Sequence, residues 1–361
     1  MNRKAIDGIL DLARWAPSGD NTQPWRFEVK SESEILVHGY DTRAHCVYDL
    51  DGRGSQTAHG ALLETLAIAA TRFGCRAQSS IVSENADGRI VYRVTLAADS
   101  SLAEDPLVGA IRERSVQRKP MSATPLRPEH RLALERSVEP YAIKWFDSWS
   151  ARWRMAVLNA RNAYIRLTIP EAYSVHKATI AWNCTTSEDR LPDASLGADP
   201  LLLVMMRWAM ASWERVDRLN RYAGGTLMPR LTLDLIPGLL CSTHFALLAP
   251  KDASGAADYV AAGRAVQRFW LTATELRLQM QPGYTPLVFA SYARQRRRFT
   301  KDDRAEARAR EIASRLDDVL GADAAKRIVL LGRLGAARSA GGRSLRLPLD
   351  RLIVQTAPAN L

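Results

Sequence analysis

Two segments of the chain share one pattern, and this pattern limits the folds that the chain can adopt. GALLETLAIAATRFGC (60–75) and GRAVQRFWLTATELRL (263–278) each begin with glycine, carry an apolar stripe at helical spacing and lead into a strand. The repetition favours a chain built from two copies of one helix-and-strand unit. Because the identity between the segments is low, a chance likeness of two amphipathic helices is the alternative.

Hydrophobic periodicity elsewhere predicts a mixture of helices and strands. Helical spacing predicts helices over about 3–16, 55–73, 256–278 and 302–319, and further helices that begin near 107 and near 127. Alternating or continuous apolar residues predict strands over about 25–37, 89–97, 141–146, 239–250 and 327–335. A helical stretch rich in Trp, Met and Arg covers about 150–235 and is interrupted by a polar loop at 184–197.

Composition excludes several classes of protein. The 361 residues suffice for two domains, no apolar run is as long as a membrane span, and the N-terminus lacks a signal-peptide core, so we expect a cytoplasmic protein. The four cysteines and six histidines show no metal-ligand spacing, which predicts free thiols and no metal. A net charge of +11 is compatible with nucleic acid as a binding partner. No nucleic-acid-binding motif accompanies the arginine runs, and we expect a cofactor phosphate and solvated surface to account for them.

The sharpest motif is APSGDNTQPW (16–25). Pro17 ends a helix and Pro24 forces an extended chain, so the residues between them form a loop. Backbone N–H groups and the side chains of Ser18, Asn21 and Gln23 could there meet the edge of a planar polar ligand. An ordinary helix–loop–strand connection is the alternative.

A second motif, AIRERSVQRKP (110–120), places Arg114 and Arg118 four residues apart with Ser115 between them. Two guanidinium groups and a hydroxyl form a suitable phosphate site, because guanidinium forks match phosphate oxygens in geometry and charge. A solvated basic helix end is the alternative.

Together these motifs resemble those of the FMN-dependent nitroreductase family. APSxxNxQPWxF, completed by Phe27, resembles the loop that contacts the flavin, and 112–118 resembles the RxSxR/K element that binds the FMN phosphate. Val116 departs from the family pattern, because Ser or Thr usually stands there. The resemblance implies cofactor contacts from both motifs: Pro17, Ser18, Gly19, Asn21, Gln23, Arg114, Ser115 and Arg118.

Two C-terminal segments strengthen the resemblance. LRLQMQPGYT (276–285) is similar to a family segment in which a backbone amide after the proline faces flavin N5, although Arg277 replaces the usual Gly. RSLRLP (343–348) resembles the closing strand, whose arginine reaches the phosphate; Arg346 is the first candidate, before Arg343 and Arg338. The resemblance therefore adds a second set of cofactor-binding residues: Pro282, Gly283, Tyr284, Thr285 and Arg346.

The motifs lie in opposite halves of the chain. The loop at 16–25 has no phosphate element before it, and the arginines at 112–118 have no such loop after them. The family resemblance then implies an α+β, nitroreductase-like fold duplicated in one chain, with mainly antiparallel sheets flanked by helices. We expect repeat 1 over 1–104, repeat 2 over 105–361, a helical lid at about 150–235 and one complete FMN site. The chain would be a monomeric pseudo-dimer or a homodimer.

The implied activity is hydride transfer between NAD(P)H and an unidentified small molecule through flavin N5. No catalytic side chain can be named, and four residues of the lid are candidates for the pocket: Tyr173, His176, Trp182 and Tyr222. One alternative is a protein that only binds and sequesters FMN. Another is a flavin dehydrogenase of the azoline type, acting in a natural-product pathway. The third alternative is a basic protein that binds nucleic acid.

Overall fold

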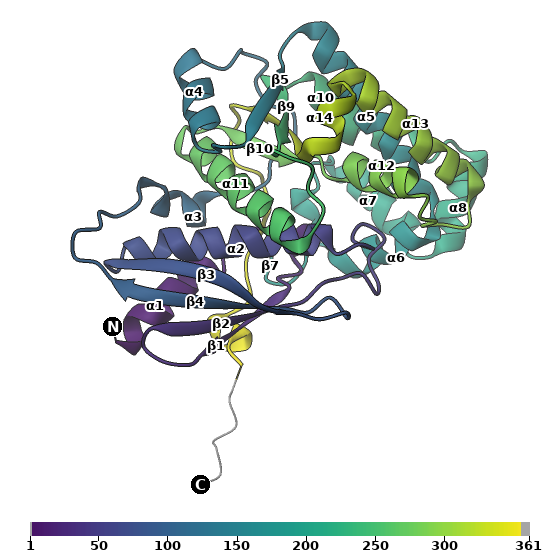
Figure 1. Cartoon of the computed structure of the whole chain (residues 1–361). Helices are drawn as coiled ribbons and strands as arrows, with labels where there is room; N and C mark the ends of the chain where they lie inside the picture. Colours follow the sequence, from purple (N-terminus) through teal and green to yellow (C-terminus); the bar gives the residue numbers. More distant parts are fainter. Residues whose placement is uncertain (1, 355–361) are drawn as a thin grey trace.

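The computed structural model describes residues 2–354, which form an α+β fold with two four-stranded antiparallel sheets (Figure 1). The first sheet has the order β1-β2-β4-β3 and packs on helices α1 and α2. Its elements follow the chain as α1 (Arg3–Ala13), β1 (Trp25–Val29), β2 (Glu34–Gly39), α2 (Arg53–Thr71), β3 (Cys75–Glu84) and β4 (Ile90–Ala98).

The second sheet has the order β5-β9-β11-β10 and its own apolar core against α11. Its elements are α4 (Pro128–Arg136), β5 (Ala142–Phe146), β9 (Thr243–Leu248), α11 (Ala256–Glu275), β10 (Gln279–Pro282) and β11 (Ile328–Gly335). Matched by their order along the chain, the strands of the two sheets have the same arrangement. In both sheets the long helix connects the second strand to the third.

Two helical insertions distinguish the second half from the first. Between β5 and β9 the chain forms α5 (Trp149–Thr168), α6 (Pro170–Thr179), α7 (Pro200–Ala209), α8 (Trp213–Tyr222), α9 (Leu227–Pro229), a π-helical turn η4 (Arg230–Leu235) and α10 (Ile236–Leu239). Between β10 and β11 it forms α12 (Thr285–Gln295), α13 (Asp303–Leu320) and α14 (Ala322–Arg327). Helices α5, α12 and α13 share a third apolar core.

The helices α2 and α11 cross at two glycines, and Figure 1 shows them side by side between the two sheets. A Cβ on Gly60 would lie 1.9 Å from the carbonyl oxygen of Val260, and one on Gly263 would lie 2.0 Å from that of Thr57. The contact is symmetric, because each glycine meets the residue three positions before the other. Glycine is required at both positions, since any side chain would collide with backbone.

The C-terminal segment returns to the first sheet. After β12 (Arg343–Ser344) and the short helix α15 (Leu349–Leu352), Ile353 pairs with Phe27 in β1, and the Val354 N–H donates to the Phe27 carbonyl at 2.7 Å. The end of the second half therefore contacts the loop that precedes β1.

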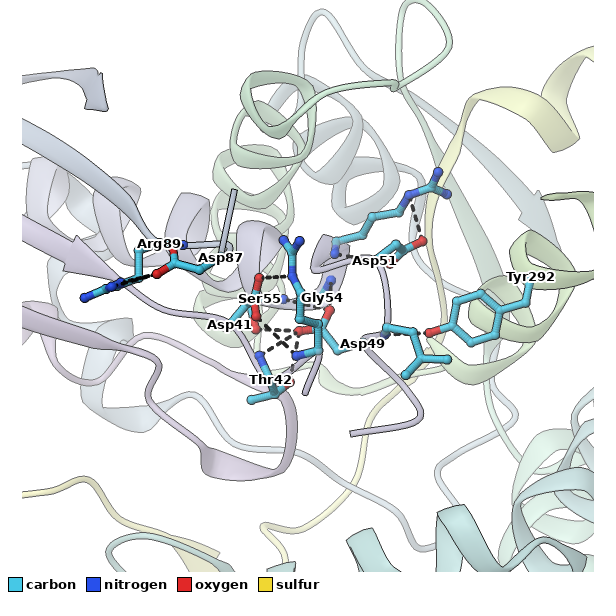
Figure 2. A network of polar contacts seen from close by, with 12 residues as sticks. Asp41, Thr42, Asp49, Asp51, Gly54, Ser55, Asp87, Arg89 and Tyr292 are labelled. Carbon is cyan, nitrogen blue, oxygen red and sulfur yellow. Dashed lines mark hydrogen bonds and ion pairs between the residues drawn. The ribbon is translucent and has the colours of Figure 1, made fainter. Parts of the chain in front are cut away.

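The loop before α2 is fixed by one carboxylate (Figure 2). Asp49 accepts hydrogen bonds from the Gly54 N–H at 2.7 Å, the Ser55 hydroxyl at 2.6 Å and the Thr42 hydroxyl at 2.9 Å. The bond from the Gly54 N–H and a longer one from the Ser55 N–H, at 3.3 Å, satisfy N–H groups that the first helical turn leaves without intrahelical acceptors. Asp49 is therefore a capping residue, and its neighbour Tyr48 is held in place.

Short helical turns and short strands complete the described chain: η1 (Gly19–Asn21), η2 (Pro106–Val108), α3 (Ala110–Glu113), β6 (Ile180–Ala181), β7 (Thr186–Ser187), β8 (Leu191–Pro192) and η3 (Asp193–Ser195). Within residues 2–354, no helix combines the length and apolar character needed to cross a bilayer. The same residues contain no group of His, Cys, Asp and Glu arranged to hold a metal ion, and Cys46, Cys184 and Cys241 are free thiols.

Candidate functional site

The loop at 16–25 has an unusual backbone. Asp20, Asn21 and Gln23 have φ values of 49°, 61° and 47°, in the left-handed region that residues other than glycine seldom adopt. The Ser18 hydroxyl accepts a hydrogen bond from the Gln23 N–H at 2.9 Å, and His59 Nε2 lies 2.9 Å from the Pro24 carbonyl oxygen. Such strain persists only where the surroundings enforce it, and it is concentrated at functional sites.

Two arginines that are far apart in the sequence meet at the start of this loop. Arg114 Nη2 donates to the Trp15 carbonyl at 2.9 Å, and Arg346 Nε donates to the Ala16 carbonyl at 3.0 Å. Their side chains are 95% and 93% buried, since their exposed fractions are 5% and 7%. The structure thus brings together Arg114, Arg346 and the first residues of the loop.

Aromatic rings complete this arginine cluster. The Arg114 guanidinium lies 4.5 Å from the ring centroid of Trp270, and that of half-buried Arg343 lies 4.9 Å from the Trp15 ring. Such contacts favour a cation at a desolvated site. Sequence reasoning missed both tryptophans, since neither belongs to the matched motifs.

Within the described chain, Arg114 and Arg346 in this cluster are influenced only by other positive charges. Burial, with Arg346 and Arg343 close by, holds the pKa of Arg114 well below its ordinary value. Burial, followed by the charges of Arg343 and Arg14, lowers the pKa of Arg346 to about 9. Within residues 2–354, neither Arg114 nor Arg346 forms an ion pair. Buried charges are costly unless they are paired, so an anion bound here would relieve an existing strain.

Three buried N–H donors in the same cluster have no acceptor within the described chain: Trp15 Nε1, Arg114 Nε and Arg343 Nε. Buried polar groups in proteins are almost always hydrogen-bonded, so each of these unpaired donors needs an explanation. A phosphate group offers several acceptor oxygens and up to two negative charges, which matches both the donors and the charge. The residues present therefore fit the phosphate end of FMN.

Arg118 lies apart from this cluster, contrary to the sequence prediction that it shares the phosphate with Arg114. Its Nη1 donates to the Ser195 carbonyl at 3.0 Å, and burial lowers its pKa, with the charge of Asp20 acting against this shift and that of Arg166 adding to it. The reason is Arg333, whose Nη2 donates to the carbonyls of Arg118 at 2.7 Å and Lys119 at 3.0 Å and fixes the chain there. Ser115 is half-buried, and its hydroxyl has no hydrogen-bond partner within residues 2–354.

The amides of Asn21 and Gln23 are used by the protein itself. Asn21 Nδ2 donates to the carbonyls of Glu188 at 3.0 Å and Leu345 at 3.2 Å, and Gln23 Nε2 donates to the Glu188 carbonyl at 2.8 Å. Gln23 Oε1 accepts from the Leu347 N–H at 2.9 Å. The prediction that these side chains face a planar ligand is therefore not met in this conformation, because another loop lies over them.

The flanking loop residues differ in their contacts. Pro17 and Ser18 are half-buried, whereas Gly19 is exposed, and a Cβ there would meet nothing within 4 Å. Close packing of the protein therefore does not require glycine at this position.

The segment predicted to face flavin N5 is partly committed to the second sheet. Pro282 is the last residue of β10, and the Gly283 N–H donates to the Leu331 carbonyl at 2.7 Å, so that amide is not free for a cofactor. Half-buried Tyr284 caps the N-terminus of α12, and the Thr285 hydroxyl accepts from Asn162 Nδ2 at 2.7 Å. The amides of Tyr284 and Thr285 remain candidates, because the first N–H groups of a helix lack intrahelical acceptors.

A polar pair that the sequence did not reveal lies between the loop before α2 and helix α6. The Tyr48 hydroxyl and His176 Nε2 are 2.9 Å apart, and their rings stack with centroids 5.8 Å apart. Burial lowers the pKa of His176 to about 3 and raises that of Tyr48, so both groups are neutral at pH 7. Beside them, Arg166 Nη2 binds both carboxylate oxygens of Asp234 at 2.9 and 2.7 Å.

The other pocket candidates differ in their positions. Tyr173 is buried and donates to the Met210 carbonyl at 3.1 Å, which is a structural role. Trp182 is half-buried, and Tyr222 is 84% exposed at the end of α8. The exposed candidate Arg338 contributes its carbonyl to Gln117 Nε2 at 2.6 Å.

The chain is similar to solved structures of nitroreductase-like proteins, at low identity. No protein-family model matches the chain, and no curated protein matches it. Among solved structures, a nitroreductase-like family protein from Bacillus cereus is similar, with 13% identity, a TM-score of 0.36 and coverage of 71% of this chain and 97% of that one. The FMN-dependent nitroreductase NfnB from Mycobacterium smegmatis, solved in complex with NADPH, has 14% identity, a TM-score of 0.35 and coverage of 69% and 96%. These values are too low to place the chain in a family.

Proposed function

We propose that the chain is an FMN-dependent oxidoreductase of the nitroreductase type, with one flavin site formed between its two halves. The observation that carries the proposal is the arginine cluster of Arg114, Arg343 and Arg346 at the flavin-type loop. Arg114 and Arg346 form no ion pair within residues 2–354, and three buried N–H donors at the cluster have no acceptor there. A phosphate monoester supplies what the cluster lacks.

The arrangement of the two sheets supports an internal duplication. Both have the same strand order, and Gly60 and Gly263, the first residues of the two similar segments, form a symmetric contact. A symmetric contact of this kind is what two identical units related by a twofold axis would make. In this proposal the loop comes from the first unit, and Arg114 and Arg346 come from the second.

Bound FMN would supply hydride exchange at its N5 atom. The protein's own residues would anchor the phosphate through the arginine cluster and shape the surroundings through the helices between β5 and β9. The neutral Tyr48–His176 pair holds a proton between Oη and Nε2. NAD(P)H is the proposed electron donor, and a small organic molecule is the proposed acceptor.

The phosphate assignment is tested by Arg114→Ala, with Arg297→Ala as its control. Both variants remove one arginine, but Arg297 is exposed and lies two residues after the end of α12. Losing a charged hydrogen bond costs about 1.5–3 kcal/mol, so Arg114→Ala should weaken FMN binding by roughly tenfold to a hundredfold. Fluorescence titration with FMN measures the effect, and equal affinities of the two variants would show that the phosphate site is elsewhere.

Sequestration of FMN without redox catalysis is the second candidate function. It is favoured by the amides of Asn21 and Gln23, which bind the chain's own backbone, and by the Gly283 amide, which is committed to the sheet. Anaerobic addition of NAD(P)H to the flavin-loaded protein separates the two functions. Bleaching of the flavin band supports the oxidoreductase, and a stable band supports sequestration.

A further inference from the structure

We infer that residues 184–190, here called the plug, occupy the place of the flavin's polar edge and must leave before the cofactor can bind fully. This inference rests on the proposed FMN site and adds a closed state to it. The plug contains β7 (Thr186–Ser187) and precedes β8 (Leu191–Pro192).

The first argument is competition for the same donors. The Glu188 carbonyl accepts from both Asn21 Nδ2 and Gln23 Nε2, and the Arg190 carbonyl lies 3.4 Å from Asn21 Nδ2. A flavin presents carbonyl oxygens along its pyrimidine edge, and these are acceptors of the same kind. The peptide carbonyl and the flavin edge therefore cannot use these amides together, because each amide has few donors.

The second argument is that the plug is weakly attached. Its side chains are mainly polar, and five of its seven residues are exposed: Thr185, Thr186, Glu188, Asp189 and Arg190. It is held mainly by hydrogen bonds rather than by buried apolar side chains. Segments with few apolar contacts open at low free energy.

The third argument is the geometry of its ends. Asn183 lies directly before the plug, and Gly197 ends the stretch 191–197 after it, here called the base; their φ values are 60° and 86°. Asp193 accepts hydrogen bonds from the N–H groups of Asn183 at 2.8 Å and Cys184 at 3.2 Å, so the base stays fixed. Motion of the tip about residues at the ends of a loop is the usual geometry of such displacements.

The fourth argument connects the plug to the arginine cluster. The Arg343 N–H donates to the Thr185 carbonyl at 2.8 Å, and the Leu345 N–H donates to the Ser187 carbonyl at 2.7 Å. The plug is thus paired with the same segment that carries Arg343 and Arg346. A ligand that fills the phosphate position alone leaves the plug in place, whereas a ligand that also needs the amides displaces it.

Hydrogen–deuterium exchange of the full-length protein tests the inference, with FMN and inorganic phosphate as separate probes at saturating concentration. We expect FMN to increase exchange in peptides covering 184–190 and phosphate to leave it unchanged. FMN binding with unchanged exchange at 184–190 would overturn the plug and leave the FMN site standing. Failure of FMN to bind at all would overturn the FMN site and the plug together.

Ser344→Ala provides an independent test. The Ser344 hydroxyl donates to the Arg190 carbonyl at 3.2 Å, so its loss loosens the plug without removing a charge from the cluster. The matched control is Ser174→Ala, which removes an exposed hydroxyl on α6 that donates to the Pro170 carbonyl. We expect Ser344→Ala to accelerate FMN association by about two- to tenfold, as the loss of one hydrogen bond implies. Equal association rates for the two variants would overturn the plug.

Discussion

At the scale of single residues, the arginine cluster shows how an unfavourable arrangement can indicate a ligand. Arg114 and Arg346 are buried next to each other, are partly satisfied by backbone carbonyls and pair with no carboxylate in the described chain. Folding gains little from such an arrangement, because desolvation of each charge is costly. Binding of an anion is the physical reason that we propose for its presence.

Arg114→Met tests this reasoning without a ligand. Methionine fills a similar volume and removes one buried, unpaired positive charge, so the cost of desolvating that charge is removed as well. We expect the unfolding free energy of the flavin-free protein to remain within about 1 kcal/mol of the wild type or to rise, while FMN affinity falls. Urea denaturation measures the former, and a loss of several kcal/mol would instead indicate that Arg114 is structural.

His59 gives a prediction for pH. Burial lowers its pKa to about 4, while the unfolded chain titrates near the ordinary value of 6.5, so the unfolded state binds the proton more readily between these values. The stability that neutral His59 contributes to the folded state is present in full above pH 6.5 and is lost as the pH falls towards 4. Each such histidine steepens the decline in stability by up to about 1.4 kcal/mol per pH unit.

The variant His59→Gln should therefore show a shallower fall in unfolding free energy between pH 6.5 and 5 than the wild type. Denaturant titrations at a series of pH values measure the slopes. Identical slopes would mean that His59 is protonated in the folded state.

At the scale of elements, regular hydrophobic patterns allowed correct prediction and mixed ones did not. The helices α2 and α11 and the strands β4 and β9 agree with the sequence prediction, because their apolar spacing is clear. A strand was expected after segment 60–75, and β3 lies there, but its bounds could not be predicted because, after buried Cys75, most of its side chains are polar and at least partly exposed. Helix α12 was missed because it follows directly after the turn-forming residues Pro282 and Gly283.

For the site, the sequence could indicate which side chains matter but not what they contact. Arg114 and Arg346 could be paired only through the family resemblance, since their spacing carries no information. The bonds of Asn21 and Gln23 to residue 188 could not be predicted, because the acceptor is a backbone carbonyl. Any residue type at 188 would present the same group.

The crossing of α2 and α11 gives a prediction at this scale. Gly60→Ala or Gly263→Ala places a methyl group about 2 Å from a backbone oxygen, so the helices must separate. We expect a loss of about 1–3 kcal/mol or more in unfolding free energy for each variant. Gly109→Ala is the control, because its φ of −59° is ordinary and a Cβ there meets nothing within 4 Å. A loss as small as that of the control would show that the helices can separate freely.

At the scale of the whole molecule, the chain resembles two interlocked units. The two sheets keep separate cores, while α2 and α11 join them and the C-terminal segment pairs with β1 (Figure 1). If the proposed site lies between two units, fusion in one chain fixes their ratio. The boundary near residue 104 stays a prediction.

Co-expression of fragments 1–104 and 105–361 tests the division. We expect the two fragments to copurify in equal amounts, because the α2–α11 contact and the C-terminal pairing connect them. Size-exclusion chromatography of the tagged mixture measures this. Two soluble fragments that elute separately would contradict a fold built on that interface.

The number of flavins per chain tests the central claim most directly. FMN released from the loaded, desalted protein can be measured by absorbance and divided by the protein concentration. The account predicts one FMN per chain, because the loop and the arginine cluster each occur once, in opposite halves. A protein that retains no flavin after loading, or that retains two, would contradict it.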